Sequence, residues 1–119
     1  MAKCKTQRNV MAFATGSATW LAGYISDLPT PFDESGEIDW VAFAKICQRQ
    51  IEAGAAAIVV AETAGEASNL TTPEHDAVVR AAVRIAHGRL RVIAGAGSNS
   101  TAQAIELVRR AERGYCLSG

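Results

Sequence analysis

The sequence has little cysteine, little histidine and no excess of charge of either sign. Cys4, Cys47 and Cys116 are far apart with no CxxC pair, which argues against a disulfide framework and against a cysteine-bound metal. His75 and His87 have no ligand spacing from any cysteine, so we expect them on helix surfaces and predict no metal site. The 12 basic and 12 acidic residues balance, so the charge gives no reason to expect a nucleic-acid partner.

A long apolar run is also missing. No segment approaches the roughly 18 consecutive apolar residues of a membrane span, so no membrane partner is expected. Lys3, Lys5 and Arg8 precede the apolar patch VMAFA in the order of an export signal, but this patch is shorter than the roughly 7–15 residues that export requires. Free thiols are typical of a reducing compartment. We therefore expect a cytoplasmic chain, with residues 1–19 as a disordered extension and residues 20–119 as the structured domain.

From residue 20 onwards, strand patterns and helix patterns alternate. Three segments rich in β-prone or continuously apolar residues predict strands. WLAGYISDLPTPF predicts a strand that ends at Pro29 and Pro31 and is followed by a loop, and the other two segments are AAAIVVA and LRVIAGAG. Each of the three is followed by a segment with helical periodicity: WVAFAKICQRQIEAG, LTTPEHDAVVRAAVRIAHG and SNSTAQAIELVRRAERG. This alternation predicts a parallel sheet with right-handed crossovers. Periodicity does not separate an open sheet from part of a closed barrel.

The helices carry recognisable start signals. Asp39 is expected to cap the first helix, and Thr71 with Glu74 has the spacing of a capping box at the second. Ser100 and Gln103 repeat this spacing at the third helix. The residues predicted on the apolar side of the first helix are Val41, Phe43, Ala44, Ile46, Cys47 and Ile51.

Ligands of parallel α/β folds bind in the loops that follow the carboxyl ends of the strands. The middle loop, ETAGEASN, offers the hydroxyl of Thr63 and the amides of Ala64 and Gly65 to an anion or a carbonyl oxygen. Alternatively, Thr63 and Glu66 only tie this loop to neighbouring amides. The third loop, AGAGSNST, has Ser100 where GxGxxG needs glycine and has no P-loop lysine, so its glycines are expected to permit close packing.

Three segments taken together resemble the start of a known family. PTPFDESGEID, AIVVAETAGEASNLTTPEH and RVIAGAGSNSTAQAIEL are similar in order and separation to the dihydrodipicolinate synthase / N-acetylneuraminate lyase family, over residues 23–114. The resemblance implies a (β/α)₈ TIM barrel that joins pyruvate to a lysine as a Schiff base. The expected fold class is then α/β, the first three β/α units of such a barrel, truncated. The resemblance further implies no cofactor, a pyruvate or other 2-oxo acid substrate, and homo-oligomeric full-length relatives.

The resemblance also assigns roles within the middle loop, which reads G-T-T-G-E in the family. Thr63 matches the first threonine and is expected to keep its catalytic hydroxyl in a proton relay. Ala64 matches the second threonine and retains only its amide, and Gly65 matches the glycine; both are expected to bind the substrate. Glu62 stands where the family has glycine, so it adds negative charge near the expected site of an anionic substrate.

The family's Schiff-base lysine and catalytic tyrosine belong to later strands and have no match here. The lysines of this sequence are Lys3, Lys5 and Lys45, none at the catalytic position. One hypothesis is therefore a dihydrodipicolinate synthase-like lyase fragment that is inactive alone, produced by a frameshift or a premature stop. Another is a non-catalytic remnant or assembly partner of another barrel fragment, and a third is an anion-binding module. The substrate within the family and the oligomeric state stay open.

Overall fold

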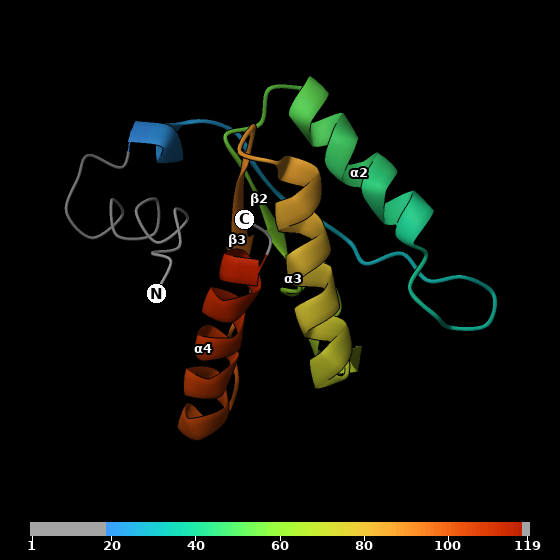
Figure 1. Ribbon diagram of the computed structural model, residues 1–119, viewed down its shortest axis with the longest axis vertical. Coiled ribbons are helices and arrows are strands. Elements are labelled where there is room, and N and C mark those ends of the chain that lie inside the picture. The colour runs from blue at the N-terminus through green and yellow to red at the C-terminus, as the bar shows by residue number, and fades with distance from the viewer. Residues whose placement is uncertain (1–18, 118–119) are drawn as a thin grey trace.

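The computed structural model describes residues 19–117 and shows the expected alternation of strands and helices (Figure 1). The elements are η1 (Thr19–Ala22), β1 (Ile25–Asp27), α2 (Trp40–Glu52), β2 (Ala57–Val60), η2 (Ala67–Asn69), α3 (Thr72–Ala86), β3 (Arg91–Ala94) and α4 (Thr101–Leu117). The prediction of a disordered extension falls on residues 1–19 and, apart from Thr19, lies outside the described residues. Within residues 19–117, none of the helices combines the length and the hydropathy that crossing a membrane requires.

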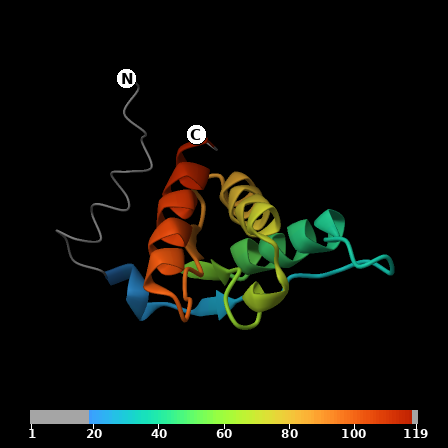
Figure 2. The same ribbon diagram turned by 90° about the horizontal axis from the view of Figure 1, so that it is seen from below.

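The three strands form one parallel sheet in the order β1-β2-β3. Ile25 pairs with Ala57, which in turn pairs with Arg91, and this register continues to the carboxyl ends of the strands. Figure 2 shows α2, α3 and α4 together on one side of the strands. Two consecutive βαβ crossovers therefore build the sheet, and the predicted α/β class with three β/α units is confirmed.

The core lies between β2 and the helices. Ile58 and Val60 of β2 are buried in one cluster with Phe43 of α2 and with Val78 and Val79 of α3. Because side chains alternate along a strand, the residues between them point to the opposite face of the sheet. The register places six residues on that opposite face: Ile25, Asp27, Ala57, Val59, Arg91 and Ile93.

The first predicted strand is longer than the observed one. β1 comprises only Ile25–Asp27, because Thr19–Ala22 forms a 3₁₀ turn instead of the start of a strand. The strand ends before Pro29 and Pro31, as the sequence predicts. Proline has no amide hydrogen to donate to a neighbouring strand. The loop nevertheless retains one isolated antiparallel bridge between Phe32 and Ile38.

The start signals at Asp39 and Thr71 are confirmed, the capping box at Ser100 forms only its bond from the Gln103 amide, at 3.4 Å, and one apolar position is wrong. Asp39 accepts a hydrogen bond from the Ala42 amide at 2.9 Å, and both bonds of the Thr71–Glu74 capping box are present. The predicted place of Val41 on the buried side of α2 is wrong, since 68% of Val41 is exposed. Val41 precedes the buried Phe43 by two residues, which is about 200° around a helix of 3.6 residues per turn.

The end of α3 offers a stability test. His87 caps this helix in the left-handed conformation with φ 44°, and its side chain is exposed. Glycine adopts this conformation without a Cβ penalty. We expect His87→Gly to raise the free energy of unfolding by about 1 kcal/mol, measured by urea denaturation. His87→Ala keeps the penalty and serves as the control. Equal stabilisation by both variants would contradict the explanation.

Candidate active-site loops

The first two strand-to-helix loops are joined by a buried hydrogen bond. The hydroxyl of Thr30, which is 4% exposed, donates to the carbonyl oxygen of Gly65 at 2.7 Å. Gly65 is itself buried, and a Cβ there would lie 3.0 Å from the Ala61 nitrogen and 3.2 Å from the Leu28 carbonyl oxygen. The close passage of the Thr-Ala-Gly-Glu turn along the two strand ends therefore favours glycine at this position.

The second loop is a compact turn between two left-handed residues. Ala61 has φ 52° and Glu66 has φ 55°, values that are strained for residues with a side chain. Between them, the Glu66 amide donates to the Thr63 carbonyl oxygen at 3.1 Å, and the Ala67 amide donates to the Glu62 carbonyl oxygen at 3.2 Å. These two bonds close the turn, and Thr63 lies on its exposed side.

The structure separates the three predicted site residues. Thr63 is exposed and lines a pocket, as described below. The Ala64 amide donates to Oδ2 of Asp27 at 3.3 Å, on the sheet face opposite the helices. Gly65 is buried, with its carbonyl oxygen held by Thr30. The assigned catalytic and binding roles of these residues stay predictions, and sequence reasoning missed the contact between Asp27 and Ala64.

A pocket of about 460 Å³ lies between the second loop, the third loop and the start of α4. The polar side chains that line it are Glu62, Thr63, Ser68, Thr72, His75, Ser98, Asn99 and Gln103. The Glu62 carboxylate extends towards the third loop, because its Oε2 lies 2.5 Å from the place of a Cβ on Gly95. The carboxylate of Glu62, which stands where the family has glycine, thus lies beside Gly95 and Gly97 of the third loop.

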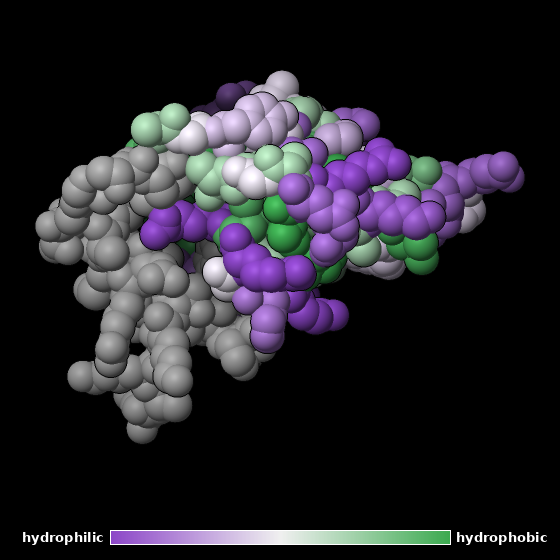
Figure 3. Space-filling view, turned by 90° about the horizontal axis from the view of Figure 1, so that it is seen from above, coloured by the Kyte–Doolittle hydropathy of each residue, from purple (hydrophilic) through white to green (hydrophobic). Residues whose placement is uncertain are grey.

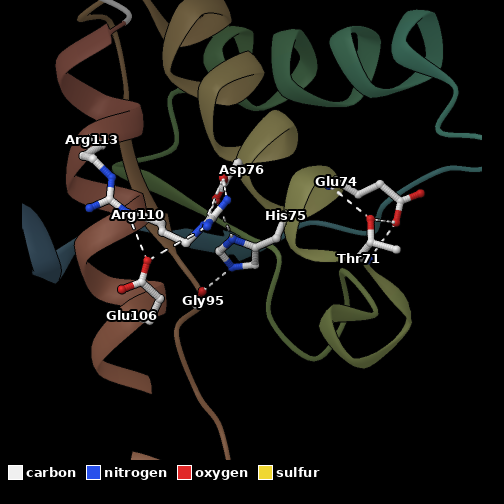
Figure 4. A network of polar contacts seen from close by, with 8 residues as sticks. All are labelled: Thr71, Glu74, His75, Asp76, Gly95, Glu106, Arg110 and Arg113. Carbon is white, nitrogen blue, oxygen red and sulfur yellow. Dashed lines mark hydrogen bonds and ion pairs between the residues drawn. The ribbon is translucent and has the colours of Figure 1, made fainter. Parts of the chain in front are cut away.

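The prediction that His75 lies on a helix surface is wrong. His75 is 4% exposed, and its Nε2 forms a 2.7 Å hydrogen bond with the carbonyl oxygen of Gly95, drawn in Figure 4. Its position three and four residues before Val78 and Val79 places it on the apolar side of α3, a spacing that could have revealed its burial. This bond attaches α3 to the end of β3.

A charged contact beside His75 joins α3 to α4. Arg110 binds both carboxylate oxygens of Asp76, with Nε distances of 3.2 and 3.1 Å, and also approaches Glu106 at 3.9 Å (Figure 4). The Asp76 carboxylate raises the pKa of the Arg110 guanidinium. Nδ1 of His75 lies 4.0 Å from Oδ1 of Asp76 and has no hydrogen-bond partner within residues 19–117. The bonds between Arg110 and Asp76 thus hold α4 against α3 next to His75, which lines the pocket.

The described residues offer no evident nucleophile or metal centre. Cys47 is buried in α2, and burial raises the pKa of its thiol to about 11, which keeps it protonated near neutral pH. Lys45 is exposed on the same helix, outside the loops. In residues 19–117 no three side chains of histidine, cysteine, aspartate or glutamate are placed to share a metal ion.

Comparisons with known proteins agree on one family. The model of the dihydrodipicolinate synthetase family matches residues 20–116. The 4-hydroxy-tetrahydrodipicolinate synthase of Hyphomonas neptunium is 53% identical over 90 residues, which cover 76% of this chain and 30% of that protein. The corresponding synthase of Methylobacterium radiotolerans is 48% identical over 103 residues, which cover 87% of this chain and 33% of that protein. The chain thus spans about a third of the length of these curated relatives.

Solved structures give the same result. Dihydrodipicolinate synthase from Aquifex aeolicus matches 77% of this chain and 31% of its own, with a TM-score of 0.74 and 41% identity. The chloride-inhibited synthase from Acinetobacter baumannii, complexed with pyruvate, matches 77% of this chain and 32% of its own, with a TM-score of 0.76 and 40% identity. The three β/α units therefore match part of a TIM barrel, and the predicted fold class is confirmed.

The two glycines of the third loop provide a matched pair of variants. A Cβ on Gly95 would lie 2.1 Å from the carbonyl oxygen of Ala61, whereas the nearest atom to a Cβ on Gly97 would be Oε1 of Glu62 at 4.0 Å. We expect Gly95→Ala to lower the free energy of unfolding by at least about 3 kcal/mol, because backbone must move. Gly97→Ala is expected to change it by less than about 0.5 kcal/mol. Similar losses in both variants, measured by urea denaturation, would contradict the close approach.

Proposed function

This chain belongs to the dihydrodipicolinate synthetase family, and we propose that its loops serve the lyase reaction of that family on pyruvate or another 2-oxo acid. The observation that carries the proposal is the Thr-Ala-Gly-Glu loop, which the Thr30–Gly65 hydrogen bond holds at the carboxyl end of β2. Ligands of parallel α/β folds bind at this edge of the sheet.

Thr63 is the proposed catalytic residue of this chain. Thr63 is exposed on a turn closed by two backbone hydrogen bonds and lines the pocket, which supports a role of its hydroxyl in passing a proton. The amides of Ala64 and Gly65 are the proposed contacts of the substrate carboxylate. Because the Glu62 carboxylate extends towards Gly95, it leaves this contact to the backbone of the turn.

We propose that the nucleophilic lysine comes from polypeptide beyond the three β/α units. A Schiff-base lysine requires a lowered pKa, which a desolvated pocket or a neighbouring cation provides. Lys45 is exposed on α2, outside any desolvated pocket and away from the loops, and the positions of Lys3 and Lys5 lie outside the described residues. On this proposal the 119 residues alone do not catalyse the reaction.

A second candidate function is a non-catalytic remnant or an assembly partner of another barrel fragment. The favouring observation is that Val59 and Ile93 lie side by side on the sheet face opposite the helices and are only half-buried. Apolar side chains are also open on helix surfaces: Ile105 and Val108 of α4 are each 47% exposed. Figure 3 shows apolar atoms in green at the surface between polar ones. Such surfaces favour association.

Borohydride trapping distinguishes the two candidates. The chain is incubated with pyruvate and borohydride, either alone or after refolding with the part of the Hyphomonas neptunium synthase that follows the 90 matched residues. We expect no adduct on the chain alone and, in the mixture, an adduct on a lysine of the added fragment. An adduct on Lys45 would contradict the proposal that the nucleophilic lysine comes from polypeptide beyond the three β/α units. An assembled mixture without any adduct would favour the non-catalytic candidate.

The same mixture tests Thr63. Loss of a proton-relay hydroxyl lowers turnover by about 10²-fold or more, so Thr63→Val is expected to reduce kcat by that factor. Thr63→Ser restores a hydroxyl and should recover most of the rate. Thr101→Val, at the exposed start of α4, is the matched control and should leave kcat unchanged. If Thr63→Val behaves like this control, the relay role is wrong.

A further inference from the structure

Asp27 of β1 lies outside the three family-like segments and has no role in the proposed mechanism. It is the last residue of β1, it is exposed, and its register partner is Val59, which in turn pairs with Ile93. Its side chain points to the sheet face opposite the helices, where its Oδ2 accepts the amide hydrogen of Ala64 at 3.3 Å. A carboxylate of this chain thus already lies on the turn proposed to bind a substrate carboxylate.

The contact has two consequences for an incoming anion. The Ala64 amide carries one hydrogen, so a substrate carboxylate must replace Asp27 or share that hydrogen with it. The approaching anion also meets the charge of Asp27 at short range, and like charges at such distances disfavour each other even where solvent is present. Both effects act before any chemistry and concern binding alone.

The turn carries a further negative charge. Glu62, on the same turn, is negative as well, and its carboxylate extends towards Gly95. Arg91 lies on the same sheet face as Asp27, but at the opposite end of its strand, two residues before the position in register with Asp27. Asp27 is therefore the charged side chain that touches the turn from β1.

We propose that Asp27 is a specificity-determining residue that acts as an internal competitor for the Ala64 amide and weakens the binding of carboxylate ligands. The inference rests on the proposed function, because it takes the Ala64 amide as the contact of the substrate carboxylate. Removal of the Asp27 carboxylate then frees this amide and removes the repulsion. The affinity of the turn for a simple carboxylate rises as a result.

The test measures carboxylate binding directly at the turn. The ¹⁵N-labelled full chain is titrated with acetate and, separately, with pyruvate, while the amide resonances of Ala64 and Gly65 are followed by NMR. Acetate has a carboxylate but no keto group, so its binding is independent of Schiff-base chemistry. We expect Asp27→Ala to bind acetate at least about tenfold more tightly than the unmodified chain, since competitor and charge are both removed.

Two further variants separate the charge from the hydrogen bond. Asp27→Asn removes the charge and keeps an acceptor oxygen, so its acetate affinity should fall between those of the unmodified chain and Asp27→Ala. If Asp27→Ala fails to fold, which the loss of dispersed amide resonances would show, the acetate affinity of Asp27→Asn decides the test. Glu34→Gln makes the same change of net charge on the exposed turn before α2 and should leave the affinity unchanged.

The outcomes distinguish this inference from the proposed function. Equal acetate affinity in the unmodified chain and in Asp27→Ala would overturn the role of Asp27. The absence of saturable shifts at Ala64 in Asp27→Ala would overturn it too, since the freed amide would then not be an anion contact. Tighter acetate binding without pyruvate binding would support the role of Asp27 and contradict a 2-oxo acid substrate.

Discussion

The close approach of Gly95 to Ala61 is the constraint on which the arrangement of the loops depends. The amide of Gly95 donates to the Val60 carbonyl oxygen at 2.9 Å, and its carbonyl oxygen receives the bond from His75. A Cβ would meet the Ala61 carbonyl oxygen at 2.1 Å, so the two backbones run together with no side chain between them. One residue thus fixes the end of β2, the start of the third loop and the position of α3.

The geometry of the second loop depends on this close approach of Gly95 to Ala61. Ala61 begins the loop in a left-handed conformation, and Thr30 secures its far side through the Gly65 carbonyl oxygen. Strained backbone persists only where surrounding structure holds it, and here buried contacts on both sides do so. The exposed hydroxyl of Thr63 and the amide of Ala64 are therefore positioned by strand ends rather than by the loop alone. The parallel sheet is what brings the first two loops close enough to share hydrogen bonds.

The sequence predicted the elements and several of their ends, but not the contacts between loops. The continuous apolar segment AIVV became the buried central strand, and the capping box at Thr71 formed as its spacing indicated. The burial of His75 was missed because a histidine was assigned by its polarity rather than by its place in the helical repeat. The contact between Asp27 and Ala64 spans 37 residues and depends on strand register, which no local pattern specifies.

We propose that further polypeptide completes the sheet. Val59 and Ile93 lie on the face that α2, α3 and α4 leave uncovered, and the chain spans about a third of the relatives it matches. Amide hydrogen exchange of β1 and β3 tests this most directly, measured with and without the remaining part of the Hyphomonas neptunium synthase. We expect slower exchange in both strands on mixing. Unchanged exchange, with both polypeptides folded, would contradict it.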